Sequence, residues 1–264
     1  MNFRSWFKNI YYGNLPEGRR AFPYFGTRVY FPKNSLVFRV ACESRIYEWE
    51  NVRILEALAE RNSTVIDVGA NIGLMAVPLL ASIKELNVLS FEPSPNSLPY
   101  LQRTVRDSAF ASRWRVIGEA VGSAPGGSVT FHIASKELGA FDGIRNTSRV
   151  DSSTTIKVPM TTIDHQWQEA GNPRVSVIKI DVEGAEKTVI EGASKCLSVN
   201  RPALLVEWNS SNLAAFDCDP TWLLSFAKET GYSVHGLPSL ALVTNPAALI
   251  AHMALTESFL LLPA

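Results

Sequence analysis

The chain has 264 residues and a mass of 29.1 kDa, a length that fits one large domain or two small ones. Hydrophobic residues make up 46% and aromatic residues 10%, a globular composition that excludes disorder over the whole chain. Lys and Arg number 25 and so do Asp and Glu, so the zero net charge argues against a general nucleic-acid-binding protein.

The first 44 residues are expected to form an N-terminal arm. Apolar side chains recur there at helical spacing and predict a short amphipathic helix with a face of Phe3, Trp6, Phe7, Ile10 and Tyr11. Because few basic residues accompany it, packing on the domain or on a partner subunit, which includes oligomerisation, is favoured over a membrane surface. A segment rich in Gly, Pro and aromatic residues then leads to an expected strand at residues 36–41.

Residues 45–264 are expected to form one α/β domain, because helical and β-branched apolar segments alternate along them. Strands are expected at residues 64–66, 87–91, 114–117, 128–133, 175–180 and 203–206, helices at 52–59, 74–80 and from 186 to about 199, and a last helix and two closing strands near 223–226, 232–235 and 258–262.

A glycine-containing turn, residues 67–73 (DVGANIG), follows the first of these strands. Glycines let the backbone turn tightly and approach a ligand at the carboxyl end of a parallel strand. Glu92 ends the next strand 25 positions after Asp67, near the spacing at which dinucleotide folds place an acid on ribose hydroxyls. A turn that needs glycine for its shape alone is the alternative, which the position of Glu92 weakens.

An acid at the strand end disfavours a pyrophosphate and suits an ammonium or sulfonium group, so the pattern points to S-adenosylmethionine. The strand at residues 114–117 is expected to end at the same edge of the sheet and to place the adenine side there. The expected cofactor contacts are Asp67, Gly69, Ala70, Asn71, Gly73, Glu92, Gly118, Glu119, Ala120 and Asp181.

A second group of acids, Asp181, Glu183 and Glu207, follows the strands at residues 175–180 and 203–206. In a parallel sheet these side chains converge on one cleft, where acids accept a substrate proton, hold hydroxyl groups or bind a divalent metal. Asp181 is the first candidate for a base or substrate anchor, with Lys179, Glu183 and Glu207 as supporting catalytic groups; no metal ligand is assigned.

Glu186 and the stretch from residue 139 to residue 155 are two further polar features of the chain. Glu186 is expected only to favour the start of the following helix through the helix dipole. The polar stretch from residue 139 to residue 155 is interpreted as a mobile substrate loop or lid, with a plain surface excursion as the alternative.

Five segments, in this order and spacing, resemble the FkbM family of S-adenosylmethionine-dependent methyltransferases: residues 67–74 (DVGANIGL), 91–93 (FEP), 161–164 (TTID), 178–186 (IKIDVEGAE) and Glu207. The resemblance covers roughly residues 47–208 and implies a class I methyltransferase (Rossmann-like) fold. That fold has a seven-stranded, mostly parallel sheet with one reversed edge strand and helices on both faces. The resemblance also implies methyl transfer to a hydroxyl. The family often has Tyr-Glu-Pro-Glu before its first strand; Tyr47-Glu48-Trp49-Glu50 matches in part and makes Tyr47 and Glu48 cofactor or substrate contacts.

The expected function is O-methylation of a hydroxyl on a sugar, glycan or secondary metabolite. A non-catalytic cofactor-binding or assembly module is the main alternative, and a nicotinamide-dependent dehydrogenase is disfavoured by the missing GxGxxG. Three cysteines without CxxC spacing, and no apolar stretch near the roughly 20 residues of a membrane span, favour a cytoplasmic protein. The zero net charge favours no nucleic-acid partner.

Overall fold

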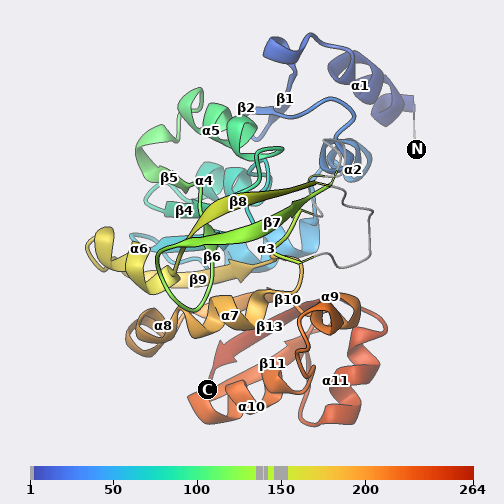
Figure 1. Cartoon of the computed structure of the whole chain (residues 1–264). Helices are drawn as coiled ribbons and strands as arrows, with labels where there is room; N and C mark the ends of the chain where they lie inside the picture. The colour runs from blue at the N-terminus through green and yellow to red at the C-terminus, as the bar shows by residue number, and fades with distance from the viewer. Residues whose placement is uncertain (1–2, 135–138, 140–141, 146–153) are drawn as a thin grey trace.

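An eight-stranded sheet runs through the centre of the computed structural model, which describes residues 3–134, 139, 142–145 and 154–264 (Figure 1). The elements of the described residues are α1 (Phe3–Gly13), η1 (Glu17–Arg19), β1 (Ala21–Tyr24), β2 (Thr27–Tyr30), α2 (Leu36–Ser44), α3 (Trp49–Leu58), β3 (Thr64–Val68), α4 (Ala76–Ser82), β4 (Asn87–Phe91), α5 (Leu98–Arg106), η2 (Ala111–Arg113), β5 (Trp114–Ile117), β6 (Ala120–Val121), β7 (Ser128–Ile133), β8 (Thr154–Thr161), α6 (Ile163–Glu169), β9 (Val175–Ile180), α7 (Glu186–Glu191), α8 (Ser194–Asn200), β10 (Ala203–Glu207), α9 (Ser210–Ala215), α10 (Trp222–Thr230), β11 (Tyr232–Gly236), β12 (Ala241–Leu242), α11 (Pro246–Met253) and β13 (Ser258–Pro263).

The strand order across the sheet is β12-β11-β13-β10-β9-β3-β4-β5. The strands from β10 to β5 are parallel, while β13 runs antiparallel to both of its neighbours. The expected α/β class with a mostly parallel sheet is confirmed. The sheet has an eighth strand because the two-residue β12 pairs with β11, and the reversed strand β13 lies inside the sheet rather than at its edge.

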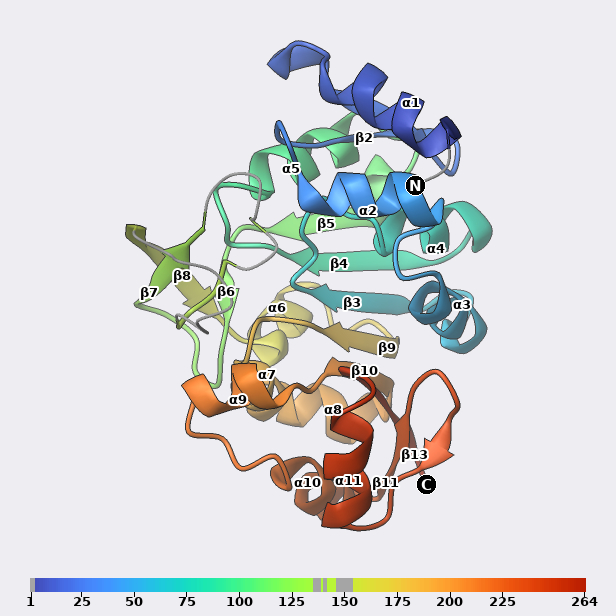
Figure 2. The same cartoon turned by 90° about the vertical axis from the view of Figure 1, so that its right-hand side faces the viewer.

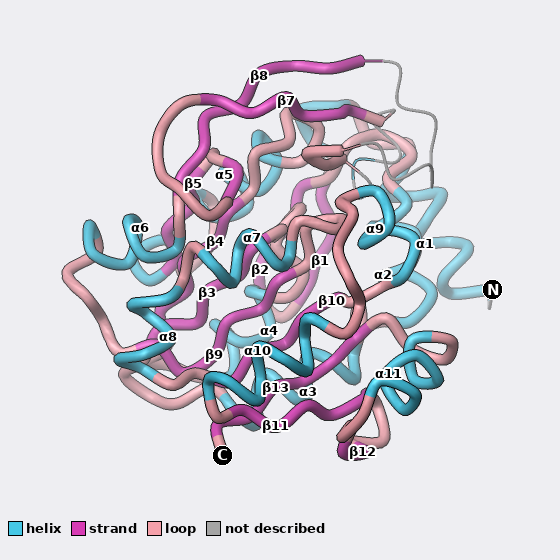
Figure 3. The backbone as a smooth tube through the Cα atoms, turned by 60° about the horizontal axis from the view of Figure 1, so that its bottom comes forward, coloured by secondary structure: helices cyan, strands magenta, loops and turns pink. Residues whose placement is uncertain are grey.

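Helices cover both faces of the sheet, and each face has its own apolar cluster. Alternation along β3 explains this, since Val65 belongs to one cluster while Ile66 and Val68 belong to the other. Helices α2 to α5 supply the first cluster, and α6 to α8, α10 and α11 supply the second, with α8 and α10 lying over the sheet in Figure 3. The apolar run that predicted this strand therefore supplies side chains to both layers of helices.

A three-stranded sheet of order β6-β8-β7 lies beside the central sheet (Figure 2). The expected strand at residues 128–133 is confirmed as β7, which pairs with β8, a strand that the sequence analysis did not include. An isolated bridge between His132 and Gly143 brings the chain after β7 back toward the end of this small sheet.

The expected strand at residues 36–41 is wrong, because this segment begins the helix α2. Ser35 caps the helix by accepting a hydrogen bond from the N–H of Phe38. The buried residues of α2 recur at helical spacing and pack into the same cluster as α4, namely Val37, Phe38, Ala41 and Cys42. A run of apolar residues this short fits a strand or a helix by pattern alone, and packing on the sheet decides it here.

The helix expected up to about residue 199 is two helices, α7 and α8. The chain bends at Gly192, where a Cβ would overlap the carbonyl oxygen of Gly122. The predicted N-terminal helix is confirmed as α1, which packs beside α2. Among the described residues no helix is both long and apolar enough to cross a membrane.

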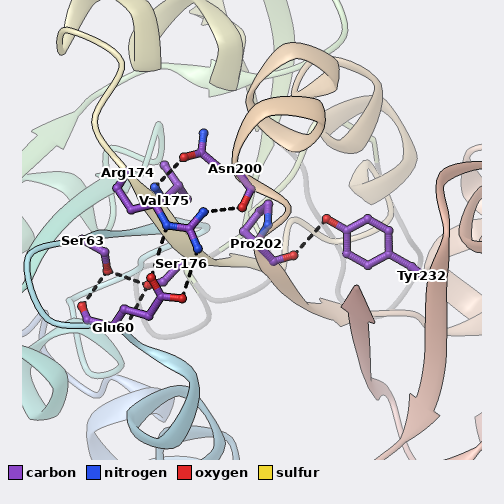
Figure 4. Close-up of polar contacts among 8 residues, drawn as sticks. All are labelled: Glu60, Ser63, Arg174, Val175, Ser176, Asn200, Pro202 and Tyr232. Atoms are coloured by element: carbon purple, nitrogen blue, oxygen red, sulfur yellow. Dashed lines mark hydrogen bonds and ion pairs between the residues drawn. The ribbon is translucent and has the colours of Figure 1, made fainter. Parts of the chain in front are cut away.

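The amino ends of the central strands are tied together by a polar cluster (Figure 4). Arg174 pairs with Glu60 at 3.1 Å and donates to the carbonyl oxygen of Asn200. The hydroxyls of Ser63 and Ser176 hydrogen-bond at 2.7 Å. These contacts link the start of β3 to the start of β9, so this edge of the sheet is fixed by side chains.

Candidate active site

A cavity of about 330 Å³ lies where β3, β4, β9 and β10 end. Open α/β sheets bind their ligands at this carboxyl edge. Its described lining carries one lysine, Lys179, and eight acids, which are Glu48, Glu92, Glu119, Asp142, Asp181, Glu183, Glu207 and Glu257. This charge distribution suits a ligand that is cationic or rich in hydroxyl groups.

The turn after β3 is shaped by two close approaches. Gly69 has a φ of +79°, and a Cβ there would overlap the carbonyl oxygen of Asp181, so a side chain does not fit. Asn71 has a φ of +50°, and its N–H donates to Glu92 Oε2 at 2.7 Å. The turn therefore joins the ends of β3, β4 and β9 and leaves Ala70 and Asn71 on the cavity wall.

Glu92 is buried at the end of β4 and still reaches the cavity. Its Oε1 accepts from the N–H of Ser94 at 2.8 Å, while Oε2 accepts from Asn71. Burial, opposed by these two hydrogen bonds, raises the pKa of Glu92 to about 7. A carboxylate oxygen has two lone pairs, so each oxygen keeps one for a ligand hydroxyl.

Lys179 lies at the centre of the site. Its Nζ lies 3.1 Å from Asp181 Oδ2 and 3.7 Å from Asp67 Oδ1, and it donates to the carbonyl oxygen of Gly69 at 2.9 Å. Burial opposes the charge of Lys179, but Asp181, Asp67 and Glu48 outweigh it and raise the pKa of the amine. Lys179 is therefore a permanent cation in this site.

Three carboxyl groups lie within 4.8 Å of one another: those of Asp181, Glu183 and Glu207. Burial, together with repulsion from Asp181 and Glu183, raises the pKa of Glu207 far above its usual range, so this group keeps its proton at neutral pH. The buried Asn212 donates to Glu183 Oε2 at 3.0 Å and to Glu207 Oε2 at 3.5 Å. A proton and an amide thus relieve the repulsion among these acids.

Glu48 and Tyr47 line the same cavity, just before α3. Glu48 has a φ of +43°, and its Oε2 accepts from the side-chain amide of Asn51 at 2.9 Å. Burial and the charge of Asp181 raise the pKa of Glu48, and burial also raises that of Tyr47. The partial match that the sequence showed at these positions therefore falls on the cavity.

Three of the expected cofactor contacts, Asp67, Gly73 and Gly118, are not among the described residues that line the cavity. Asp67 is 2% exposed and faces Lys179 behind the wall. A Cβ at Gly73 would meet the Trp114 ring at 2.6 Å, and one at Gly118 would meet Leu98 at 2.8 Å. These three positions support the site through packing and charge. The cavity is lined by Glu48, Gly69, Ala70, Asn71, Glu92, Glu119, Ala120, Lys179, Asp181, Glu183 and Glu207.

Asp142 is a cavity residue that the sequence analysis did not single out. It accepts hydrogen bonds from Ser94 Oγ, from Asn96 Nδ2 at 3.0 Å and from the N–H of Ala134 at 2.7 Å. It therefore ties residues 142–145 to the loop after β4. Residues 140–141 and 146–153 of the expected loop or lid lie outside the described residues. Glu186 accepts from the N–H groups of Val182 and Gly184, which agrees with its expected structural role.

We expect the free energy of unfolding to fall as the pH rises from about 5 to about 8. Burial raises the pKa of Glu92 and of Glu186 from 4.5 to about 7. Between these values the folded chain binds more protons than the unfolded chain, so the stabilisation is complete below 4.5 and is lost as the pH passes 7. Urea unfolding at both pH values measures this slope. Glu186→Gln should flatten it, and an unchanged slope in that variant would refute the assignment.

An acid-lined cavity beside a glycine turn, at the carboxyl edge of a mostly parallel sheet, defines the chain as an α/β protein of the nucleotide-cofactor-binding class. Residues 67–234 match the family model described as the Methyltransferase FkbM domain. The chain belongs to the FkbM methyltransferase family, which confirms the family identified from its motifs.

A curated relative is the hexuronic acid methyltransferase AglP of Haloferax volcanii, 33% identical over 156 residues. The match covers 58% of this chain and 59% of that relative, so the chain spans less than two thirds of its length. Among solved structures, the methyltransferase FkbM from Methylobacillus flagellatus is similar with a TM-score of 0.49 and 21% identity over 85% of this chain and 51% of that one. A putative caffeoyl-CoA O-methyltransferase from Staphylococcus aureus has a TM-score of 0.49 and 9% identity over 87% of this chain and 91% of that one.

Proposed function

We propose that the chain binds S-adenosylmethionine in this cavity and transfers its methyl group to a hydroxyl of a sugar. The observation that carries the proposal is the position of Asp181 beside the cofactor turn, on a cavity wall with a permanent cation and seven other acids. Family membership supports methyl transfer, and the relative named as a hexuronic acid methyltransferase favours a sugar over a secondary metabolite.

The residues present fit the cofactor. Its ammonium and sulfonium groups are cationic, and the described lining of the cavity is mostly acidic. The turn of Gly69, Ala70 and Asn71 offers its backbone for the amino-acid end, and Glu92 offers free lone pairs for the ribose hydroxyls. Glu119 and Ala120 follow β5 on the same wall, where the adenine would lie. Glu48, on the wall before α3, is assigned to the cofactor as well.

When bound, S-adenosylmethionine supplies an electrophilic methyl group. The chain contributes orientation, which is worth about 7–11 kcal/mol when a nucleophile is well aligned. Asp181 accepts the proton of the acceptor hydroxyl, which adds a factor of about 10²–10⁴. Lys179 holds Asp181 in place through their 3.1 Å ion pair. Glu207, which keeps its own proton, and Glu183 hydrogen-bond to the acceptor rather than act as bases.

We expect label from methyl-labelled S-adenosylmethionine to be incorporated into simple sugar glycosides by the purified chain. Because eight acids line the described cavity, methyl glucoside should react at least about tenfold faster than methyl glucuronide, whose carboxylate is repelled. Incorporation measured by scintillation, with a phenolic metabolite as a third acceptor, tests this. Transfer to the phenol alone would refute a sugar acceptor, and no transfer to any acceptor would favour the non-catalytic module.

Two arms of the same assay separate the remaining alternatives. Mild alkali releases a methyl ester and leaves a methyl ether intact, so alkali-labile label would assign the acceptor to a carboxylate instead of a hydroxyl.

Dialysis against EDTA should leave the rate unchanged, because a proton on Glu207 already relieves the repulsion among the three acids. A loss of rate that Mg²⁺ restores would make Asp181, Glu183 and Glu207 metal ligands.

Glu92→Ala should weaken S-adenosylmethionine binding about tenfold to a hundredfold, since hydrogen bonds to a charged group contribute about 1.5–3 kcal/mol. The substitution also removes acceptors of two backbone N–H groups, so affinity alone does not prove ribose contact. Calorimetry with S-adenosylhomocysteine and its 2′-deoxy and 3′-deoxy analogues resolves this. The wild type should lose affinity for at least one analogue and the variant should not; equal losses in both proteins would remove the ribose assignment.

A further inference from the structure

Helix α1 turns its apolar side chains outward. Phe7 is 56%, Ile10 45% and Tyr11 56% exposed, and Phe7 stacks on Tyr11 with 6.2 Å between ring centroids. Tyr12, on the other side of the helix, packs against the core cluster below. The helix is therefore attached to the domain by one face and presents a separate aromatic and aliphatic face to its surroundings, next to the 47% exposed Trp6.

The charge of the chain is divided unevenly around this helix. Residues 1–45 contain eight Lys and Arg against two Asp and Glu, a net charge of +6, so the other 219 residues carry −6. Six of these basic residues are exposed in the described structure: Lys8, Arg19, Arg28, Lys33, Arg39 and Arg45. The chain as a whole is neutral, but its N-terminal segment is basic and has an apolar helix face. The helix alone carries few basic residues, which favoured a partner subunit over a membrane surface; the charge of the whole segment reverses that preference.

We propose that residues 6–40 form a surface that docks on an anionic lipid bilayer, with the outer face of α1 inserted at the headgroup level. Trp, Tyr, Phe and Ile on one face of a short helix suit that interface, and exposed basic side chains of the same segment are attracted to anionic headgroups. A second copy of the chain is disfavoured, because pairing the same surface would oppose two segments of like charge. Nucleic acid offers the negative charge but no apolar layer for Ile10.

The proposed docking surface lies next to a helix that lines the cavity. Helix α1 packs on α2, and α2 contributes Leu36 and Val40 to the lining of the cavity. In Figures 1 and 2, α1 and α2 lie together at the end of the molecule opposite α10 and β11. A bilayer held by α1 would therefore lie near the α2 side of the cavity, where an acceptor carried at the membrane surface could enter.

Co-sedimentation of the full chain with vesicles tests the proposal. The chain should bind vesicles of phosphatidylcholine mixed with phosphatidylglycerol, and bind pure phosphatidylcholine at least about tenfold more weakly. The double variant Phe7→Ser with Ile10→Ser should lose at least about tenfold in partition coefficient. Lys8→Gln should lose about fivefold, and added salt should weaken the wild type. The fluorescence of Trp6 is too mixed with that of other tryptophans to serve as the readout, so bound protein is counted directly.

Matched controls carry the same chemical change elsewhere. Leu255, 87% exposed, and Val199, 68% exposed, lie outside the surface, so Leu255→Ser with Val199→Ser should leave vesicle binding unchanged. Lys228→Gln is the charge control. Affinity for S-adenosylmethionine should be the same in all variants, which shows that they are folded and keeps this test separate from the proposed function. Equal vesicle binding by the α1 double variant, no binding by the wild type, or a dimer by light scattering that this variant dissociates would overturn the proposal.

Discussion

Asp181→Asn should lower the single-turnover rate of methyl transfer about 10²–10⁴-fold, because the amide cannot take the proton of the acceptor hydroxyl. The change keeps the shape of the side chain, and the backbone of Asp181 remains against Gly69. The affinity for S-adenosylmethionine, measured by calorimetry, should change far less than the rate. Rapid-quench measurement with labelled cofactor and saturating glycoside gives the rate of methyl transfer separately from the affinity for S-adenosylmethionine.

The matched control is Asp217→Asn, since Asp217 is an exposed acid that pairs with Arg145 at 3.5 Å outside the cavity. It should retain the wild-type rate. If Asp181→Asn also retained that rate, Asp181 would not be the base, and positioning of the acceptor would be left as the main source of catalysis.

Lys179→Met should destabilise the fold by about 3–5 kcal/mol, the usual loss when one partner of a buried charge pair is removed. Asp67 is the reason, because it is 2% exposed and Lys179 is the cation beside it. Without the amine, burial and repulsion from Asp181 would act on Asp67 unopposed. Urea unfolding measures the change, and methyl transfer should be lost as well.

A second substitution tests whether the charge of Asp67 is the cause. Asp67→Asn added to Lys179→Met should restore part of the lost stability, since contacting charges couple by about 0.5–3 kcal/mol in double-mutant cycles. Lys228→Met, an exposed lysine changed in the same way, should stay within about 0.5 kcal/mol of the wild type. Additive effects in the double variant would show that Lys179 stabilises the fold mainly by packing.

The central strands were predictable because the same residues that form them are buried on both faces. The run at residues 87–91 coincides with β4 and that at 175–180 with β9, and both end at the acids that were singled out. Parallel order then brings Asp181 and Glu207 together without further information. The carboxyl edge of the sheet is thus encoded locally, by where each apolar run stops.

The features of the fold and the site that the sequence did not predict depend on contacts between distant segments. No local sequence pattern contains such contacts. Residues 36–41 are a helix because one face packs on the domain, and Asp142 reaches the cavity because Ser94, Asn96 and Ala134 hold it there. Asp67 likewise lies behind the wall opposite Lys179, its partner on the neighbouring strand β9, and this pairing joins segments more than 100 residues apart in the sequence.

One familiar motif has a structural role that its sequence did not show. In TTID, Thr162 caps α6 by accepting from the N–H of His165. Asp164 accepts from the N–H groups of Lys195 and Cys196 at the start of α8. The motif that helped to identify the family therefore joins two helices on one face of the sheet, away from the described cavity lining.

The polar cluster around Arg174 lies apart from the cavity, so the residues that stabilise this part of the fold are not the residues that would bind the ligands. Its ion pair and hydrogen bonds join the strands at the amino edge of the sheet. These contacts do not involve the loops at the carboxyl edge, where the cavity lies. A substitution among the cavity residues can therefore alter ligand contacts while these contacts at the amino edge stay intact.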